Sequence, residues 1–204
     1  MIAQFPIIKR EDAQCFLKAL DDRTDRFTFQ TFDDNKLRND KALARIVHGT
    51  LDENYAELVN YSRNGAGIFV TINATNFRGR TKECIVEVRS YFADLDGAPY
   101  ENILRLSLKP HISTQTSPGR YGVFYNIADA PLSEKNFRQT QQQLAQLFEG
   151  DPSVCDLPRV MRLPGFPHQK DPNNPFVTQI DDRTSRRLFR DGVSTDADYR
   201  IGST

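Results

Sequence analysis

The sequence predicts one folded domain that mixes helices and strands, of the α/β or α+β class. Its 204 residues are enough for one domain with a sizeable core and fewer than two such domains usually need. Segments with helical spacing alternate along the chain with short apolar runs that are typical of strands. Hydrophobic residues make up 38% of the chain and aromatic residues 10%, which is enough to build a core and argues against disorder.

Charge and apolar patterning exclude several classes of protein. Lys and Arg number 27 and so do Asp and Glu, so the formal net charge is zero and no overall cationic field attracts nucleic acid or anionic lipid. The chain has no apolar run of about 18 residues and no basic-then-apolar leader, so we expect a cytoplasmic protein with no membrane partner. Cys15, Cys84 and Cys155 are far apart, which favours neither a disulfide framework nor a zinc site.

The N-terminal part of the chain predicts three helices and two strands. Thr50 and Glu53 form a T-x-x-E capping box, which indicates that a helix begins directly after Thr50. A β-branched apolar run after Asn64-Gly65 is typical of a buried strand. Apolar residues from Cys84 onward recur at helical spacing, although the same stretch could also be extended. In order, we expect a helix over 11–20, a strand over 26–32, a helix over 51–62, a strand over 66–72 and a helix that ends near residue 90.

The C-terminal part predicts three strands, two helices and a polar tail. Pro118-Gly119 suits the central positions of a type II turn, so the strands on either side should form a hairpin. Pro99 suits the first position of a short helix, and Gly150 ends a longer, amphipathic one. In order, we expect a strand over 91–96, a helix over 99–107, strands over 111–116 and 121–127, a helix over 133–148 and a polar tail over 181–204.

The first candidate site is the run Phe-Ala-Asp-Leu-Asp-Gly that ends the strand over 91–96. Because side chains alternate along a strand, Asp94 and Asp96 should project from the same face with their carboxylates close together. Two like charges so close favour a divalent metal ion, since otherwise one carboxylate must take up a proton. The alternative is ordinary turn chemistry, with Gly97 supplying the bend after the strand.

The second candidate site is the segment 154–170, which combines one carboxylate with four potential cations. Such a set suits a polyphosphate, because Arg binds phosphate oxygens through two N–H groups and Lys adds a point charge. The alternative is a solvated basic loop with proline-rich turns. The carboxylate is Asp156, and the cations are Arg159, Arg162, His168 and Lys170.

Three motifs in this order resemble the archaeo-eukaryotic primase (AEP) superfamily, and most closely the primase-polymerase domains of plasmids, phages and other mobile elements. The motifs are FADLDG, TSPGRYGVFY and VCDLPRVMRLPGFPHQK, and the resemblance covers about residues 64–177. It implies an α+β fold, with a mixed β-sheet, flanking helices and an RRM-like catalytic core. It also implies that residues 1–180 form the catalytic domain and that 181–204 are a linker toward a further part of a larger protein.

The resemblance implies roles for individual residues. Asp94, Asp96 and Asp156 would be the catalytic carboxylates that hold two Mg²⁺ or Mn²⁺ ions. The second motif of the superfamily usually carries a His that contacts the phosphates of the nucleotide, and Gly122 takes that place here. The nucleotide would then be bound by Arg120, Arg159, Arg162, His168 and Lys170, with a plain loop role as the alternative for His168.

The activity that the resemblance implies is DNA priming and primer extension by nucleotidyl transfer on a single-stranded DNA template. The partners would be dNTPs or NTPs, the template, and a helicase or a helical accessory domain. Between residues 159 and 190 the basic residues number seven and the acidic residues three, a modest excess that suits a nucleic-acid backbone.

Two other functions remain open from the residues. The run that contains Asp94 and Asp96 also describes the nucleophile loop of haloacid dehalogenase-type phosphohydrolases, although Ala98 stands where those enzymes have Thr. Alternatively, the absence of the second-motif His suits a catalytically inactive module that binds single-stranded DNA. The three retained carboxylates argue against that alternative.

Overall fold

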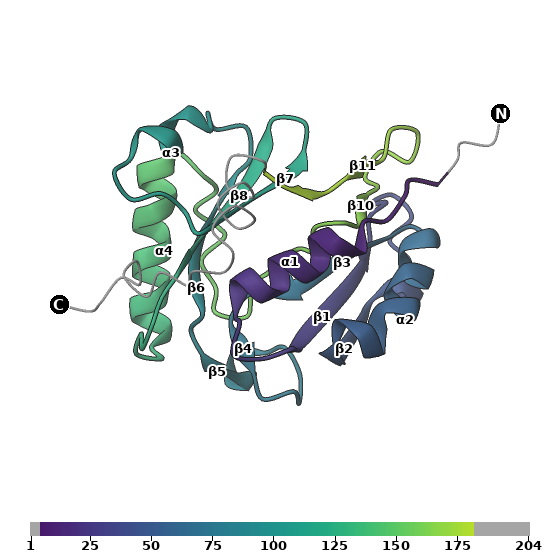
Figure 1. Ribbon diagram of the computed structural model, residues 1–204, viewed down its shortest axis with the longest axis horizontal. Coiled ribbons are helices and arrows are strands. Elements are labelled where there is room, and N and C mark those ends of the chain that lie inside the picture. Colours follow the sequence, from purple (N-terminus) through teal and green to yellow (C-terminus); the bar gives the residue numbers. More distant parts are fainter. Residues whose placement is uncertain (1–4, 182–204) are drawn as a thin grey trace.

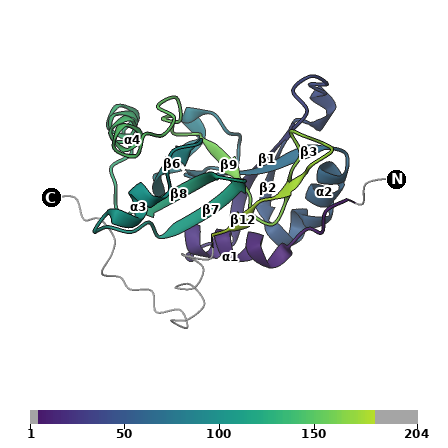
Figure 2. The ribbon, with the colours of Figure 1, turned by 90° about the horizontal axis from the view of Figure 1, so that it is seen from above.

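The computed structural model describes residues 5–181 and has two four-stranded antiparallel sheets with helices packed around them. Figures 1 and 2 show one sheet with α2 on one side of the molecule and the other sheet with α3 and α4 on the opposite side. The α+β class is confirmed. The helices are α1 (Arg10–Leu20), α2 (Leu51–Arg63), α3 (Glu101–Arg105) and α4 (Glu134–Phe148).

The strands are short and each pairs with its neighbours in antiparallel register. The first sheet has the order β2-β1-β3-β9 and the second sheet the order β12-β7-β8-β6. The first sheet contains β1 (Arg26–Asp33), β2 (Arg45–Thr50), β3 (Ala66–Thr71) and β9 (Val160–Arg162). The second contains β6 (Ser90–Leu95), β7 (Ile112–Ser117), β8 (Arg120–Asn126) and β12 (Gln179–Ile180). Two small pairs are β4 (Ala74–Thr75) with β5 (Ile85–Glu87) and β10 (Pro167–His168) with β11 (Phe176–Val177).

One face of the first sheet forms the main core with α1 and α2. The predicted capping box is present, since the Glu53 N–H donates to Thr50 Oγ1 and the Glu53 carboxylate accepts from the Thr50 N–H. α1 reaches the second sheet, where the Phe16 and Phe124 rings meet edge to face at 5.2 Å. The other face of the second sheet packs on α3 and α4 through a separate cluster of Ala93, Leu95, Tyr100, Ile103, Val123, Tyr125 and Phe148.

The strand β6 is the outer strand of the second sheet, and α4 covers its free edge. The side-chain amide of Gln141 makes two hydrogen bonds with the backbone of Phe92. Its Oε1 accepts from the Phe92 N–H at 3.0 Å, and its Nε2 donates to the Phe92 carbonyl at 3.0 Å. Gln141 therefore takes the place of a further strand and satisfies groups that an exposed edge would leave open.

Most predicted elements are confirmed, including the hairpin, whose Gly119 has φ +73° as the third residue of a type II turn requires. The helix predicted to end near residue 90 is wrong. These residues form a 3₁₀ turn, Lys82–Cys84, and then β5, where a bulge at Val86 shifts the register and hides the period of two.

Other differences concern boundaries. The strand β2 and the short strands β4, β9, β10, β11 and β12 were not predicted. The helix α3 is shorter than expected because it begins after Tyr100, so that Pro99 precedes it. Apart from Asp181, the predicted tail over 181–204 lies outside the described residues. Among residues 5–181, no helix combines the length and apolar character that crossing a membrane requires.

A buried ion pair between Asp21 and Arg89 joins the end of α1 to the segment before β6. Arg89 Nε lies 2.7 Å from Asp21 Oδ2, and both side chains are about 95% buried, with exposures of 6% and 5%. Burial opposes ionisation of Asp21, but hydrogen bonds from Arg23 and Arg89 hold its pKa below the usual value.

We predict that Asp21→Asn lowers the free energy of unfolding by about 3–5 kcal/mol at pH 7, because it leaves Arg89 buried without its counter-charge. Because the pKa of Asp21 is lowered in the folded state, its contribution is present above the unfolded pKa and is lost as pH falls through the folded pKa. Urea unfolding at pH 7 and below pH 3 measures both effects. The exposed neighbour variant Asp22→Asn is the control, and equal stability of the two variants would contradict the prediction.

Candidate functional site

Asp94 lies in β6 on the face opposite the core residues Ala93 and Leu95. Across the sheet it pairs with Gly122 of β8, which in turn pairs with Thr114 of β7. A Cβ atom at Gly122 would lie 3.0 Å from Thr114 Oγ1 and 3.4 Å from the methyl carbon of Met161. The position where the resemblance implies a His is therefore a closely packed glycine beside Asp94.

Asp94 is a half-buried carboxylate in a mixed electrostatic environment. Burial raises its pKa, and the negative charge of Asp151 raises it further. Lys170, Arg120 and Arg159 act in the opposite direction, so these three cations lie near enough to stabilise the charged form. Asp151 is fixed beside the strand because its N–H donates to the Asp94 carbonyl at 3.1 Å.

The other two predicted carboxylates are each paired with a predicted arginine. Asp96 follows β6 and forms an ion pair with Arg120, and both side chains are about half exposed. Arg159 Nη2 lies 2.5 Å from Asp156 Oδ1 and 2.7 Å from the Ser153 carbonyl oxygen. Within residues 5–181, no three His, Cys, Asp or Glu side chains are grouped so that they could hold a metal ion, so the three carboxylates do not form one cluster.

Arg162, whose side chain is 11% exposed, holds Asp34, a residue in the loop after β1 that the motifs did not indicate. Its two terminal nitrogens bind the Asp34 carboxylate at 2.6 and 3.0 Å, and its guanidinium lies 4.7 Å above the Phe69 ring centroid. Asp34 also accepts from the Gln169 N–H at 2.8 Å. A Cβ at Gly67 would overlap this pair, so a glycine is needed there.

His168 lies in β10 at the start of the short hairpin that follows the third motif. Its Nδ1 is 2.8 Å from the Thr116 carbonyl oxygen, and since a carbonyl only accepts, Nδ1 carries the proton. Nε2 is buried without a hydrogen-bond partner among the described residues. Burial, followed by the charge of Arg162, lowers the pKa of His168, so the ring is neutral at pH 7.

Gly165 of the third motif has φ +87° and contacts the N-terminal segment. The Lys9 N–H donates to the Gly165 carbonyl at 2.9 Å, and a Cβ at Gly165 would overlap the Lys9 carbonyl oxygen. Any other residue would both strain the backbone and separate these segments. Gly165 is thus a structural part of the motif.

Cations gather around Lys170, which is exposed at the end of the third motif. Desolvation lowers its pKa, and the neighbouring charges of Arg162, Lys36 and Arg120 lower it further. A bound anion would reduce the repulsion among these cations, and a polyphosphate carries enough negative charge to do so. The structure therefore brings Arg120, Arg159 and Lys170 near Asp94, with Arg162 held by Asp34 close to Lys170.

Three residues of this region were missed by sequence reasoning. Asp34 and Lys36 lie in a loop whose only signal was a cluster of charges, and Asp151 follows a predicted helix as an ordinary turn residue. None of these three residues belongs to a sequence motif with a recognisable spacing.

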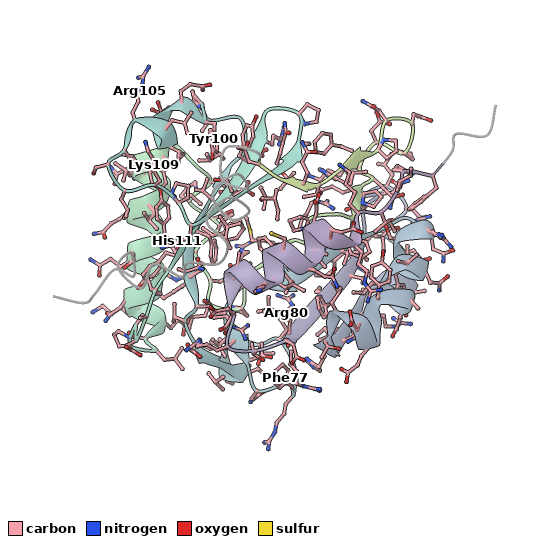
Figure 3. All side chains as sticks on the ribbon, in the orientation of Figure 1. Phe77, Arg80, Tyr100, Arg105, Lys109 and His111 are labelled. Carbon is pink, nitrogen blue, oxygen red and sulfur yellow. The ribbon has the colours of Figure 1, made fainter. Side chains whose placement is uncertain are left out.

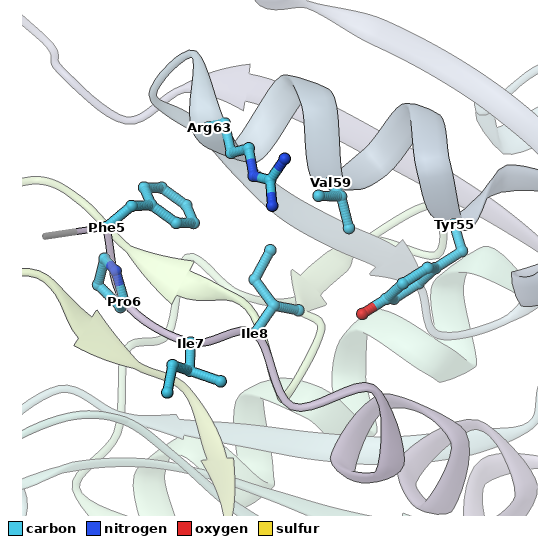
Figure 4. A pocket seen from close by; sticks show the side chains of 7 residues that line it. All are labelled: Phe5, Pro6, Ile7, Ile8, Tyr55, Val59 and Arg63. Carbon is cyan, nitrogen blue, oxygen red and sulfur yellow. The ribbon is translucent and has the colours of Figure 1, made fainter.

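A pocket elsewhere contains none of the predicted site residues. It has a volume of about 450 Å³ and lies between the N-terminal segment and α2 (Figure 4). Phe5, Pro6, Ile7, Ile8, Tyr55, Val59 and Arg63 line it. Because α2 packs on the core face of the first sheet, this pocket is separated by that sheet from Phe69 and Arg162.

We predict that His168 titrates with a pKa below the usual 6.5 and carries its proton on Nδ1 when neutral. Burial and Arg162 disfavour the imidazolium, and the Thr116 carbonyl selects the tautomer. NMR of ¹⁵N-labelled protein measures both, with His168→Gln to assign the signal. A pKa above 6.5, or a proton on Nε2, would contradict this geometry.

Comparisons with solved structures identify the same fold in primases. The AEP domain of the primase-polymerase of cyanophage S-2L has a TM-score of 0.65 at 21% identity, covering 87% of this chain and 91% of that one. Primase RepB′ has a TM-score of 0.65 at 18% identity, covering 85% of this chain and 56% of that one. The catalytic domain of RepB′ in complex with initiator DNA has a TM-score of 0.63 at 16% identity, covering 91% and 98%.

No curated protein sequence matches this chain. The family model described as the RepB DNA-primase N-terminal domain matches residues 43–194, which include all three motifs and every predicted site residue. The match is to primases and not to haloacid dehalogenase-type phosphohydrolases. On this ground the chain belongs to the RepB DNA-primase family.

Proposed function

We propose that this primase domain makes and extends primers on single-stranded DNA in the replication of a mobile element. In this reaction a 3′-hydroxyl attacks the α-phosphate of a nucleoside triphosphate, a P–O bond forms, and pyrophosphate leaves. Beyond the family itself, the observation that carries the proposal is the half-buried carboxylate of Asp94 surrounded by Arg120, Arg159 and Lys170. A negative group beside a set of cations suits a metal-bound triphosphate.

We propose Asp94, Asp96 and Asp156 as the catalytic carboxylates. The chemistry of these groups suits a hard divalent cation, because all three offer carboxylate oxygens and the charge of Asp94 is opposed by burial and by Asp151, but the three carboxylates would have to come together to share one. Mg²⁺ or Mn²⁺, when bound, would activate the attacking oxygen and stabilise the leaving one. Asp96 and Asp156 now hold Arg120 and Arg159, so their engagement with a cation would free these two arginines for phosphate.

The triphosphate would be bound by side chains from two motifs. Lys170 is exposed, and among the described residues no carboxylate forms an ion pair with it, so it is available to an anion. Arg120 and Arg159 would add N–H donors that bind phosphate oxygens in pairs. Arg162 would contribute positive charge from the fixed position that Asp34 gives it, and His168 would donate from Nε2 once protonated.

The first test is incorporation of labelled dNTPs and NTPs on a single-stranded template with Mg²⁺ or Mn²⁺, with and without a primer. We expect the double variant Asp94→Ala/Asp96→Ala to lose at least about 100-fold in rate, since the two carboxylates that it lacks are needed in the transition state. Asp22→Ala/Asp25→Ala removes two exposed carboxylates from a distant loop and should keep full activity.

The outcome also separates the alternatives. Activity that survives in the Asp94→Ala/Asp96→Ala variant would disprove the assignment of these carboxylates. If the wild type gives no product under any condition but binds single-stranded DNA, the inactive binding module becomes the better description.

A second prediction concerns the nucleotide. Lys170→Ala should raise the KM for nucleotide roughly 10-fold or more, because a hydrogen bond to a charged phosphate is lost. The rate at saturating nucleotide should change less. Lys135→Ala, an exposed lysine on α4, is the matched control, and an unchanged KM in Lys170→Ala would remove Lys170 from the nucleotide site.

A further inference from the structure

The first sheet has a second face, opposite its core face, that α1 and α2 leave uncovered. We call this the outer face. Three of its apolar side chains are exposed: Phe32 of β1 at 36%, Ile46 of β2 at 44% and Phe77 of the β4–β5 connection at 38%. Thr28 and Gln30 of the same face are buried beneath that connection, where Thr28 bonds His48 and Gln30 bonds Arg80.

Arginines lie over the exposed rings of the outer face. The guanidinium carbon of Arg80 is 5.9 Å from the Phe32 ring centroid, and that of Arg26 is 5.7 Å from the Phe77 ring centroid. Arg80 is fixed by hydrogen bonds to Gln30 Oε1 at 3.0 Å and to the Pro158 carbonyl at 2.8 Å. Figure 3 labels Arg80 just below α1 and Phe77 farther toward the lower margin of the molecule.

The charge of this face is positive. Among residues 5–181, no carboxylate lies within ion-pair distance of Arg78 or Arg80, whereas Arg26 has a long contact of 3.6 Å with Glu53. The exposed rings therefore lie beside arginines whose charge no carboxylate neutralises, in a protein whose formal net charge is zero. An anion with apolar, flat groups complements such a surface.

The backbone of Phe77 adds an independent observation. Its φ is +59°, a left-handed conformation that a bulky side chain rarely adopts. The ring makes an edge contact with His48 at 6.1 Å, yet 38% of the residue stays exposed. A strained conformation that presents an aromatic ring to solvent indicates a binding role, because core packing does not account for it.

The outer face leads to the candidate active site. Arg80 bonds the backbone of the third motif at Pro158, and the charges of Asp156 and Arg159 act on Arg80. At the other end, the Phe32 ring meets the Phe69 ring at 5.5 Å, and Arg162 lies over Phe69. A ligand on this face would therefore reach the predicted catalytic residues without crossing the core.

We propose that the outer face binds single-stranded DNA, with unpaired bases stacked on Phe77 and Phe32 and the phosphate backbone on Arg78 and Arg80. Alternating aromatic and arginine side chains suit single strands, since every base has a face to stack and duplex DNA hides it. The inference rests on the proposed function, because it assigns the path of the template strand.

The test is the affinity of the full chain for a fluorescein-labelled oligo(dT), measured by anisotropy. Phe77→Asn should weaken binding by roughly 5- to 100-fold, the usual effect of losing one stacking platform. Asn tolerates a positive φ, so this variant should unfold at the same temperature as the wild type or higher. Leu147→Asn removes an apolar residue of α4 that is 60% exposed and should bind as the wild type does.

Salt and strand type sharpen the test. Arg78→Gln, at an exposed residue next to Phe77, should reduce the slope of log affinity against log salt by about 0.7, the value for one phosphate contact on single strands. Arg63→Gln, on α2 at the opposite side of the sheet, should leave the slope unchanged. Unlabelled duplex should compete far less well than unlabelled single strand.

The outcomes separate this inference from the proposed function. If Phe77→Asn and Arg78→Gln bind as the wild type does, or if the wild type does not bind single strands, the outer face is not the template path. Either result leaves the nucleotide-incorporation assay to judge the enzyme. Conversely, binding that depends on Phe77 in a protein without incorporation activity would support the outer face and disprove the polymerase.

Discussion

The ion pair between Arg162 and Asp34 is the constraint on which the candidate site depends. Two charges at 11% and 3% exposure are stable only when each satisfies the other, so the pair fixes the loop after β1 against β9. The Gln169 N–H also donates to the Asp34 carboxylate. The pair therefore also fixes the backbone after His168, at the residue next to Lys170. Arg162 and the segment that leads to Lys170 are thus positioned from a loop far away in sequence.

The second sheet positions Asp94 through its backbone. β6 is an outer strand, yet Gln141 of α4 and the N–H of Asp151 bind its free edge, so the strand cannot shift or accept another strand there. This arrangement places the carboxylates of Asp94 and Asp151 close enough to repel, which raises the pKa of Asp94. A fixed strand that holds an unfavourable charge is typical of a site that acts on a charged ligand.

Local patterns predicted the parts of the fold that are decided locally. The capping box at Thr50, the turn at Gly119 and the motif around Asp94 depend on neighbouring residues, and the structure contains the helix, the hairpin and the strand they indicate. The partner of Arg162 could not be predicted, because Asp34 lies 128 positions away and no spacing marks it. The helix expected before residue 90 failed for another reason: the bulge at Val86 imitates helical periodicity.

The contact between Lys9 and Gly165 has a practical consequence for choosing fragments of this protein. The family match begins at residue 43, yet the third motif is held in part by a residue near the N-terminus, and α1 fills the space between the sheets. A fragment cut at the family boundary would lose both supports and expose Phe124, against which Phe16 of α1 packs. Expression boundaries for this chain should therefore be set ahead of Lys9, and an amino-terminal fusion needs a spacer before that residue.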